Sequence, residues 1–396
     1  MNIKKNYDTL IIGAGAAGLF CAIEAAKRGR KVVVIDHNTK AGAKILVSGG
    51  GRCNFTNLNT TPENFVSQNP HFCKSALSRY TPHHFLELIQ KHKIAYVEKK
   101  PGQLFCQNSA KDILNMLLHE CEQAGVKILL ETKVLSIQKD PENFLTETSQ
   151  GNFSSETLVI ATGGLSLPQI GATGFGYEIA KQFHMNIIPT SPALDGFRGN
   201  PEFQDLWKTL SGLSTPVCIR TKTKNFEDDL LITHQGLSGP AALQASLYWK
   251  QKESIEIDWC QNQKLSEWFL EKKNQGEKKT FKTLMGIFWP SRLAEHLATV
   301  FEFPSKPLVE ISNQTILELV EKIHHWTWTP EKTVGYARAE VTRGGVDTDH
   351  FSSKTLESKS ISGLFFVGEV LDVTGELGGY NFQWAWSSGW AAGKSC

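Results

Sequence analysis

The chain has 396 residues, of which 40% are hydrophobic and 21% are charged, and its formal net charge is +2. This length fits two or three domains with ordinary cores, and the composition excludes a disulfide-stapled mini-protein and a wholly disordered chain. A charge balance so close to zero gives no global attraction to nucleic acid, although it leaves room for a local basic patch.

The cysteines show no spacing typical of a zinc site or of a redox pair close in sequence. They lie at positions 21, 53, 73, 106, 121, 218, 260 and 396. We therefore expect a reduced, cytoplasmic protein without a metal, and not a flavin disulfide reductase, which needs two neighbouring cysteines. The apolar run Leu10–Ile23 resembles a secretion signal, but regularly spaced glycines interrupt it. No stretch reaches the roughly 18 apolar residues of a membrane span, so no membrane contact is expected.

A nucleotide-binding motif opens the chain. Asp8–Ile12 is typical of a buried strand, Gly13–Gly18 (GAGAAG) follows as a GxGxxG sequence, and an alanine-rich helix continues to about Lys27. A second strand, Lys31–Ile35, ends at Asp36. This order predicts a dinucleotide site, with a pyrophosphate at the helix N-terminus and the acid on a ribose hydroxyl. The acid disfavours a 2′-phosphate, and hence NADP, at this site; the alternative is a glycine-rich turn without a ligand.

The segment after the second strand is expected to contact both cofactor and substrate. Lys44–Asn57 contains four small residues in succession, Ser48–Gly51, so that backbone N–H groups can approach a planar ring. Arg52 and Cys53 would then reach an active site, where Cys53 would supply the proton of an ene reduction. The alternatives are a structural loop with Arg52 in an ion pair, and a cysteine that is only a small buried apolar residue.

The middle of the chain predicts strands followed by helices. Residues 126–161 are typical of short antiparallel strands, and the turn Ala161-Thr162-Gly163 ends the last of them where a cofactor would pass. The segment 189–192 is typical of a linker, and strands and turns are expected from there to about residue 262. From Leu265 to Trp326 the pattern is helical.

A second cofactor segment is expected far along the sequence. Gly363–Val367 is typical of a strand, Gly368-Glu369 follows it, and a glycine-rich sequence precedes a helix from about Gln383 to Lys394. In a discontinuous FAD domain the acid would hold the ribitol chain, and the positive helix end would face the flavin. A simple NAD dehydrogenase has no use for such a segment, so FAD is the predicted cofactor.

Three other features each have two interpretations. Arg343, before two glycines, would hold a substrate oxyanion or phosphate, or form an interdomain salt bridge. The lysine cluster, five lysines within residues 272–282, is either a solvated helix face or an RNA-contacting patch. Trp384, Trp386 and Trp390 lie at helical spacing and are expected in the core rather than as a platform for stacking bases.

Several longer motifs resemble those of the BaiN/RdsA-like family of NAD(P)/FAD-dependent oxidoreductases. They are Ser48–Asn57, the ATGG turn at 161–164 with Ser166 and Pro168, His234–Pro240, Val341–Val346 and Gly368–Asn381. The resemblance covers nearly the whole chain. It implies an α/β fold with a Rossmann-like FAD domain of the two-dinucleotide-binding type, an inserted β-barrel domain and a small helical domain inserted in the barrel.

The same resemblance implies domain boundaries. The FAD domain would comprise residues 1–190 and 345–396, the β-barrel domain residues 191–263 and 328–344, and the helical domain residues 264–327. No second GxGxxG sequence is evident, so NAD(P)H would bind only transiently, as the reductant.

The family implies reduction of an activated carbon–carbon double bond. Its members have been linked to two substrates, a uridine of the large ribosomal RNA and unsaturated bile-acid intermediates. The run Gly378–Trp390 matches the RNA-modifying branch better, so a 23S rRNA uridine is the expected substrate and ribosomal RNA the expected partner. The alternatives are a small enone substrate, a flavin hydroxylase and a non-catalytic, FAD-stabilised RNA-binding factor; the oligomeric state is open.

These arguments give a set of expected site residues. The expected catalytic residues are Arg52, Cys53 and Arg343. The expected cofactor-binding residues are Gly13, Gly15, Ala16, Ala17, Gly18, Asp36, Lys44, Ser48, Gly50, Gly51, Arg52, Asn54, Val134, Ala161, Thr162, Gly163, Gly368, Glu369, Gly378, Gly379, Tyr380 and Asn381.

Overall fold

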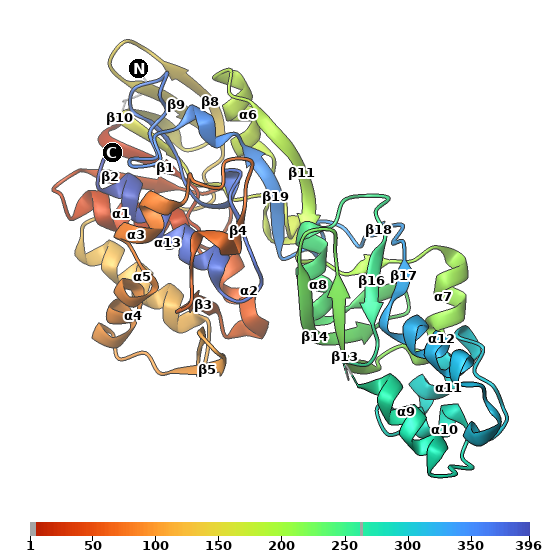
Figure 1. Ribbon diagram of the computed structural model, residues 1–396. Helices are drawn as coiled ribbons and strands as arrows, with labels where there is room; N and C mark the ends of the chain where they lie inside the picture. Colours follow the sequence, from red (N-terminus) through yellow and green to blue (C-terminus); the bar gives the residue numbers. More distant parts are fainter. Residues whose placement is uncertain (1–4, 262–263) are drawn as a thin grey trace. The chain divides into compact units, whose positions relative to one another are not determined.

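The computed structural model describes residues 5–261 and 264–396, which form two compact units (Figure 1). The first unit runs up to Pro192 and resumes over Ala339–Cys396, and the second unit spans Ala193–Arg338. The chain thus leaves the first unit once and returns to it, as a discontinuous cofactor domain requires. The three predicted domain boundaries remain a proposal, and the one at residue 263 lies outside the described residues.

A mainly parallel sheet of seven strands forms the centre of the first unit. Its strand order is β7-β2-β1-β10-β9-β8, and β20 also pairs with β10. The strands are β1 (Lys5–Ile12), β2 (Val32–Ile35), β7 (Lys127–Leu129), β8 (Val134–Lys139), β9 (Phe144–Thr148), β10 (Gly151–Ile160) and β20 (Leu364–Phe366). The antiparallel strands expected over residues 126–161 are therefore only partly right, because β7 joins β2 in parallel and β10 pairs in parallel with β1 and β20.

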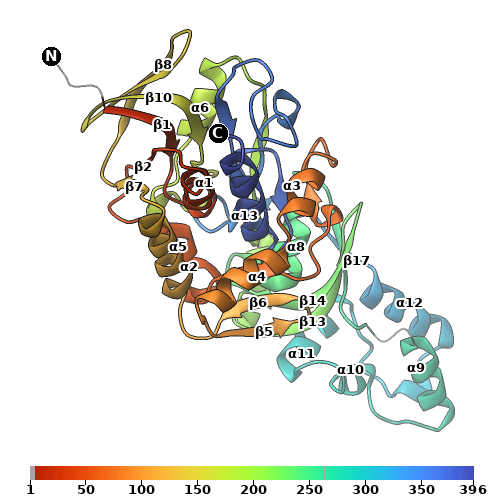
Figure 2. The same ribbon diagram turned by 90° about the vertical axis from the view of Figure 1, so that its left-hand side faces the viewer.

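Two helices from distant parts of the sequence pack closely on each other in this unit. They are α1 (Ala16–Ala26) and α13 (Tyr380–Gly393), which lie side by side in both ribbon views (Figures 1 and 2). A Cβ atom on Gly389 would lie 2.6 Å from the carbonyl oxygen of Ala17, and one on Gly393 would lie 2.7 Å from that of Cys21. Only glycine therefore permits this backbone contact, which brings the two predicted cofactor segments together.

The other elements of the first unit surround this pair of helices and the sheet. Small antiparallel sheets have the orders β3-β6-β5 and β21-β4, and a further two-stranded sheet has the order β11-β19. The elements are α2 (Ala43–Gly51), β3 (Asn54–Asn57), β4 (Phe65–Val66), α3 (Lys74–Arg79), α4 (Pro82–Lys91), β5 (Tyr96–Lys100), β6 (Gln103–Cys106), α5 (Lys111–Gln123), α6 (Phe175–Gln182), β11 (Ile187–Ala193), β19 (Val341–Val346) and β21 (Thr374–Gly375).

The linker expected at 189–192 is wrong, because these residues belong to the strand β11. Two prolines remove backbone donors there, which is tolerated in a sheet of only two strands. The approach of β19 is close: a Cβ on Gly344 would lie 2.4 Å from the carbonyl oxygen of Pro189, and Gly344 has a φ of 83°. Glycine therefore allows the pairing that the prolines did not suggest.

A buried carboxylate ties α5 to α1 and α4. Glu120 is 5% exposed, and Lys91 and His92 lie 2.6 and 2.8 Å from its Oε1, while Lys27 lies 3.0 Å from its Oε2. Burial alone would raise the pKa of Glu120, but the hydrogen bonds from these three cationic or histidine groups outweigh it and lower the pKa to about 2. The ordinary value is about 4.3, so folding favours the charged form.

The Glu120 cluster predicts a pH-dependent contribution to stability. Because the pKa is lower in the folded chain, the contribution is complete above about pH 5 and is lost as the pH falls toward 2. We expect Glu120→Gln to lower the free energy of unfolding by roughly 2–3 kcal/mol at pH 7, and by much less near pH 2. Urea denaturation at both pH values measures this. Glu122→Gln, at an exposed position of the same helix, is the control; an equal loss for Glu120→Gln at both pH values would contradict the assignment.

The second unit is an antiparallel sheet with helices. Its order is β17-β16-β13-β14-β15-β12-β18. The two edge strands are separated by only three residues, 329–331, so the sheet must curl until its edges approach, as in a barrel. The strands are β12 (Phe197–Arg198), β13 (Ser214–Arg220), β14 (Asn225–Ile232), β15 (Gly236–Ser238), β16 (Ile255–Asp258), β17 (Trp326–Trp328) and β18 (Lys332–Thr333).

The helical prediction for residues from Leu265 onward is confirmed, and strands are present before it as expected. The predicted helices appear as α9 (Leu265–Asn274), α10 (Phe281–Met285), α11 (Ser291–Val300) and α12 (Asn313–His324). Two further helices, α7 (Pro201–Trp207) and α8 (Gly239–Tyr248), lie in the stretch where strands and turns are expected to dominate, and the sequence does not predict them. A start signal for α7 was present, because Asn200 caps it by accepting a hydrogen bond from Phe203 N and proline occupies its first turn.

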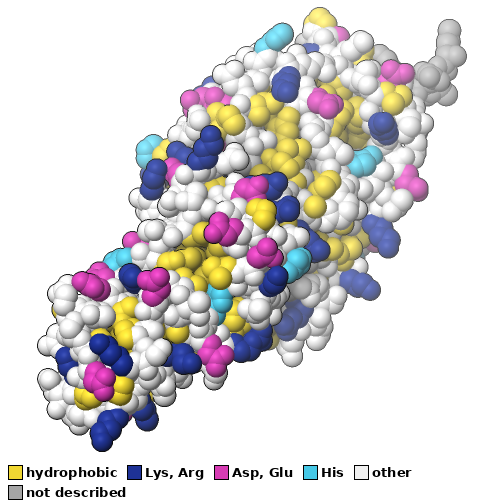
Figure 3. Space-filling view, turned by 90° about the vertical axis from the view of Figure 1, so that its right-hand side faces the viewer, with side chains coloured by type: hydrophobic (Ala, Val, Ile, Leu, Met, Phe, Trp, Pro, Cys, Tyr) yellow, Lys and Arg dark blue, Asp and Glu magenta, His cyan; other side chains and the backbone are white. Residues whose placement is uncertain are grey.

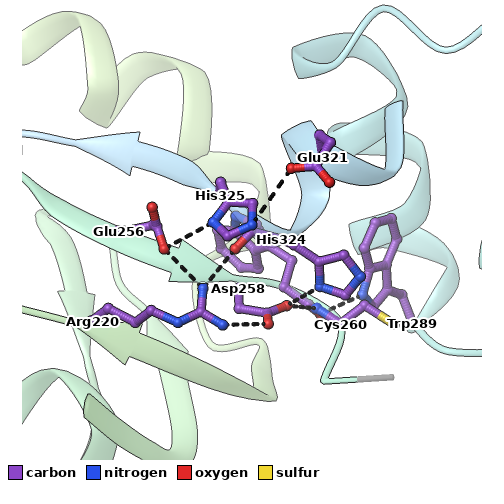
Figure 4. Close-up of polar contacts among 9 residues, drawn as sticks. Arg220, Glu256, Asp258, Cys260, Trp289, Glu321, His324 and His325 are labelled. Atoms are coloured by element: carbon purple, nitrogen blue, oxygen red, sulfur yellow. Dashed lines mark hydrogen bonds and ion pairs between the residues drawn. The ribbon is translucent and has the colours of Figure 1, made fainter. Parts of the chain in front are cut away.

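A chain of charged groups fixes the end of α12 to the sheet (Figure 4). Asp258 is 1% exposed, and its two oxygens lie 2.9 Å from His324 Nδ1 and 3.0 Å from a guanidinium nitrogen of Arg220. Arg220 also donates to Glu256 at 2.8 Å and to the carbonyl oxygen of His324 at 2.9 Å. The buried charge is thus paired and hydrogen-bonded, and the cluster joins strands β13 and β16 to the returning helix.

Candidate cofactor and active site

The first glycine loop is tightly packed except at one position. A Cβ on Gly13 would lie 2.4 Å from the carbonyl oxygen of Ala161, and one on Gly18 would lie 2.0 Å from that of Gly13. No atom lies within 4 Å of a Cβ built on Gly15. Two glycines are thus required by the fold, whereas the third exposes its backbone to open space at the start of α1. This is the shape that a pyrophosphate at a helix N-terminus requires.

Asp36 ends β2 beside this loop. Its Oδ2 accepts a hydrogen bond of 2.7 Å from Ala14 N, and its Oδ1 accepts one of 2.8 Å from Asn38 N. Carboxylate oxygens have further lone pairs, so both can still accept bonds from ribose hydroxyls. Thr132 N donates to the backbone oxygen of Asp36 at 2.8 Å, which brings the start of β8, and with it Val134, toward the expected ribose position.

The turn after β10 combines an open backbone with an unsatisfied hydroxyl. Ala161 N donates to Ile12 O at 2.8 Å, which places the turn against the end of β1. The buried hydroxyl of Thr162 has no hydrogen-bond partner in the described part of the chain. Gly163 has a φ of 72°, and no atom lies within 4 Å of a Cβ built on it. A ligand passing this strand end would find both a polar partner and room for close approach.

Lys44 and Glu369, predicted from opposite ends of the sequence, meet in the structure. Lys44 Nζ lies 2.7 Å from Glu369 Oε2, and Thr342 N donates to Glu369 Oε1 at 2.8 Å. Glu369 lies in the short helix η6 (Gly368–Val370), and a Cβ on Gly368 would lie 2.9 Å from the Cβ of Ala17. The acid is therefore held close to the start of α1, by residues from α2 and β19.

Two predicted ligands, Asn54 and Asn381, build the loop that begins α13. The amide of Asn54 is oriented so that its oxygen accepts from Gly379 N at 3.1 Å and its nitrogen donates to Leu104 O at 3.1 Å. Asn381 closes the loop by accepting from Gly375 N and donating to Gly375 O, both at 2.8 Å. Both side chains thus shape the start of α13, where Gly379 is the N-cap with a φ of 99°.

Three residues at this site were missed by the sequence analysis. Asn57 Nδ2 donates to Gly378 O at 3.0 Å, and a Cβ on Gly378 would lie 2.6 Å from Gln103 Nε2. Asn57 lies within the SGGGRCNFTN motif, so the motif offered a signal for it. Thr342 likewise lies within the motif Val341–Val346, whereas Gln103 offers no such signal, since its role depends on strands that come together only in the folded chain.

The small residues after Lys44 form a kinked helix end rather than a free loop. The backbone of Ser48, Gly49 and Gly50 departs from helical geometry, with φ values of 57° and 67° at the two glycines. Ser48 Oγ donates to Ile45 O at 2.7 Å, so this hydroxyl serves the kink itself. Arg52 follows on the surface and has no ion-pair partner among residues 5–261 and 264–396. Its guanidinium is thus available to an anionic ligand.

The predicted catalytic residues differ in exposure. Cys53 is 0% exposed, and burial raises its pKa far above the ordinary range, so the thiol is neutral at physiological pH. This favours the interpretation of Cys53 as a small packing residue, although its catalytic role stays a prediction. Arg343 is half-buried on β19; burial raises the pKa of the nearby Asp372 carboxyl, and Arg343 counteracts this. The role of Arg343 also remains a proposal.

The lysine cluster at 272–282 is divided among different partners. Lys273 donates to Asn313 at 2.6 Å, and Lys272 lies 5.9 Å from the ring centre of Trp268, while Lys278, Lys279 and Lys282 are exposed. On the face drawn in Figure 3, basic side chains are interspersed with acidic ones. Exposed lysines fit both a solvated face and an RNA-contacting patch, so both interpretations stay predictions.

Comparison with known proteins now identifies the family. The family model described as "HI0933-like protein Rossmann domain" matches residues 7–395. The chain belongs to this family. The resemblance stated from the motifs is thereby confirmed, as is the α/β fold class with a Rossmann-type sheet and additional antiparallel sheets.

Individual relatives extend this result. The chain is 47% identical over 398 residues to "Ribosomal RNA dihydrouridine synthase" of Haemophilus influenzae, covering 99% of both chains, and 45% identical over 391 residues to the protein of that name in Escherichia coli, covering 98% of both. It is 27% identical to "3-dehydro-bile acid delta(4,6)-reductase" of Clostridium scindens, over 97% of this chain and 98% of that one. The chain is an oxidoreductase of an FAD-dependent family.

The fold agrees with that of a known structure. The crystal structure of a 3-ketosteroid-delta4-(5alpha)-dehydrogenase from Rhodococcus jostii matches with a TM-score of 0.50 at 13% identity, covering 100% of both chains. Within the described ranges, no helix is long and apolar enough to cross a membrane. Nor do those ranges contain three or more metal-ligating side chains arranged to hold an ion.

Proposed function

We propose that the chain reduces a uridine of 23S ribosomal RNA to dihydrouridine, with bound FAD and with NAD(P)H as electron donor. The observation that carries this proposal is the identity of 45% and 47%, over at least 98% of each chain, to two ribosomal RNA dihydrouridine synthases. Similarity along the whole length, rather than in the FAD segments alone, includes the regions that would bind the substrate.

The residues present fit FAD at the glycine loop and its neighbours. Gly15 offers an open backbone at the start of α1, and Asp36 can accept further hydrogen bonds. The unsatisfied hydroxyl of Thr162 lies in the turn after β10. We propose that these groups hold the adenosine and pyrophosphate. Lys44 and Glu369 would hold the ribitol chain, and the start of α13 at Gly379 would face the flavin.

Bound FAD supplies hydride transfer, and the chain must supply binding, orientation and a proton. Reduction of uracil adds a hydride to C6 and a proton to C5. In our proposal Arg343 holds a uracil carbonyl oxygen through charge-assisted hydrogen bonds, and the exposed Arg52 holds a phosphate. Cys53 stays the predicted proton donor, but its full burial and raised pKa make it a weak acid, in keeping with a packing role.

The proposed function is tested by nucleoside mass spectrometry of 23S rRNA from a deletion strain. We expect the deletion to remove one dihydrouridine and a plasmid carrying the wild-type gene to restore it. The unmodified uridine should also become a substrate for the purified, FAD-loaded protein with NADH or NADPH. An unchanged dihydrouridine content in the deletion strain would refute the RNA substrate.

A small enone is the second candidate substrate. It is favoured by the 27% identity, over 97% of this chain, to the bile-acid reductase of Clostridium scindens. Two results together would select this alternative. The purified protein would turn over a steroid enone, and the deletion strain would keep its ribosomal dihydrouridine.

A further inference from the structure

A surface pocket lies in the first unit between the end of α4, the start of β5 and the helix α5. These three elements are neighbours in both ribbon views (Figures 1 and 2). The pocket has a volume of about 420 Å³, within the roughly 300–1,000 Å³ of typical small-molecule sites. It contains none of the residues predicted to bind the cofactor, so the proposed function leaves it without a role.

The pocket is lined by apolar, neutral polar and charged residues. Among its lining residues, Ile94 and Met116 are apolar, Asn108 and Asn115 carry carboxamides, and Asp112 carries a carboxylate. A carboxamide offers both donors and acceptors, as the edge of a nucleobase requires, and a carboxylate accepts hydrogen bonds from ribose hydroxyls. The lining thus suits a planar heterocycle joined to a sugar better than it suits a purely apolar or a purely anionic ligand.

One wall of the pocket is held in place and carries a free cation. His92 Nε2 lies 2.8 Å from Glu120 Oε1, and the ring of His119 meets the ring of His92 edge-on, with centroids 5.8 Å apart at 81°. The next residue, Lys93, has a φ of 54°, a conformation in which a lysine is uncommon. Lys93 is exposed and has no ion-pair partner within the described ranges, so its ammonium group can meet a phosphate at the pocket mouth.

Backbone hydrogen bonds connect the pocket to the glycine segment of the predicted active site. Ala110 N donates to Gly51 O at 2.8 Å, and Gln107 N donates to Ala95 O at 2.9 Å. Ala95 lines the pocket, and Ala110 lies two residues after the lining residue Asn108. The pocket therefore adjoins the Ser48–Gly51 segment that is expected to lie along the flavin.

We propose that this pocket binds one nucleotide unit of a reactant, with the base against Ile94 and Met116 and the phosphate on Lys93. The inference rests on the proposed function, because both reactants of that reaction are nucleotides. The bound nucleotide unit belongs either to the RNA strand, next to the target uridine, or to the adenosine half of NAD(P)H. The two sources share the same recognition chemistry and are separated by the experiment.

Two variants and one control test the proposal with the FAD-loaded, full-length protein. Asn115→Tyr fills the pocket from an exposed helix position, and Lys93→Asn removes the charge with a residue that tolerates positive φ. Gln123→Tyr places the same bulk on the same helix outside the pocket. The measurements are fluorescence anisotropy with a labelled 20-nucleotide oligouridine, and the NADH and NADPH concentration dependence of flavin reduction.

If the RNA strand is the source, both variants should weaken oligouridine binding about tenfold. Lys93→Asn should also lower the slope of log affinity against log salt concentration by about one, the effect of one lost phosphate contact. If the reductant is the source, its half-saturating concentration should rise about tenfold while oligouridine binding is unchanged. Gln123→Tyr should match the wild type in both measurements. Wild-type values for both pocket variants, with unchanged FAD content and melting temperature, would overturn the proposal.

Failure of this inference and failure of the proposed function give different results. If Asn115→Tyr does not fold, Lys93→Asn and Asn108→Ala, both at exposed positions, carry the test alone. A deletion strain with unchanged ribosomal dihydrouridine would refute the RNA reaction without altering nucleotide binding to the purified protein. A strain that loses its dihydrouridine, with pocket variants that bind both ligands normally, would refute only the pocket.

Discussion

Gly15→Ala is expected to give a stably folded protein that binds FAD at least tenfold more weakly than the wild type. Nothing lies within 4 Å of the added Cβ, and Gly15 has a φ of −87°, which alanine adopts without strain. The cost to folding should therefore stay below about 1 kcal/mol, the usual difference between glycine and alanine at a helix N-cap. The new methyl group would occupy the space left for the pyrophosphate.

The neighbouring Gly18→Ala provides the contrast. Its Cβ would lie 2.0 Å from the carbonyl oxygen of Gly13, which is backbone and cannot move aside cheaply. We expect a loss of about 3 kcal/mol or more in the free energy of unfolding. Urea denaturation of the apoproteins and titration with FAD measure the two effects separately. Full FAD affinity in Gly15→Ala would show that the pyrophosphate does not approach this position.

Trp386→Ala is expected to destabilise the first unit by about 3–5 kcal/mol. Trp386 is 0% exposed, its ring stacks on Phe85 with centroids 4.4 Å apart at 9°, and its Nε1 donates to Phe55 O at 2.8 Å. The variant loses this packing and leaves a buried carbonyl without its donor. Chemical denaturation followed by circular dichroism measures the loss.

The variant Trp386→Phe separates packing from the hydrogen bond. It keeps the ring stack and removes the indole donor, so about half of the loss or less is expected. If Trp386 instead served to stack a base, Trp386→Ala would leave the stability unchanged and weaken RNA binding, contrary to our expectation.

The parts of the fold that depend on neighbouring residues were predictable from the sequence. The strand, glycine loop, helix and second strand at the start of the chain lie within a few residues of their predicted bounds, because apolar runs and glycine spacing act locally. The core positions of Trp384 and Trp386 were also predicted and are confirmed. The last helix begins at Tyr380 rather than Gln383, since glycine-rich sequence gives little helical signal.

The errors concern contacts between distant segments. The sequence predicts a linker at β11 because its prolines are unfavourable for strands, and only pairing with β19, which approaches closely through Gly344, makes this segment a strand. The parallel pairing of β7 with β2 likewise has no local signal. The helix α8 was missed because Gly239 and Pro240, at its start, are typical of turns.

The same limit applies to the site. Asn54 and Asn381 are predicted cofactor ligands, and in the structure their amides are engaged with Gly379 and Gly375. The full burial of Cys53 also depends on surrounding strands and could not be read from its motif. In contrast, the Lys44–Glu369 contact supports the sequence argument, because two independently predicted segments meet there.

The contact between Ala17 and Gly389 also has a consequence for biosynthesis. A ribosome that adds 5–20 residues per second needs roughly 20–70 s to proceed from the first of these residues to the second. During that time the nascent first helix lacks its partner, while the intervening segment 193–338 can already fold on itself. If the start of the last helix faces the flavin, as proposed, flavin loading would follow translation of that helix, and early release from the ribosome would leave a polypeptide unable to retain the cofactor.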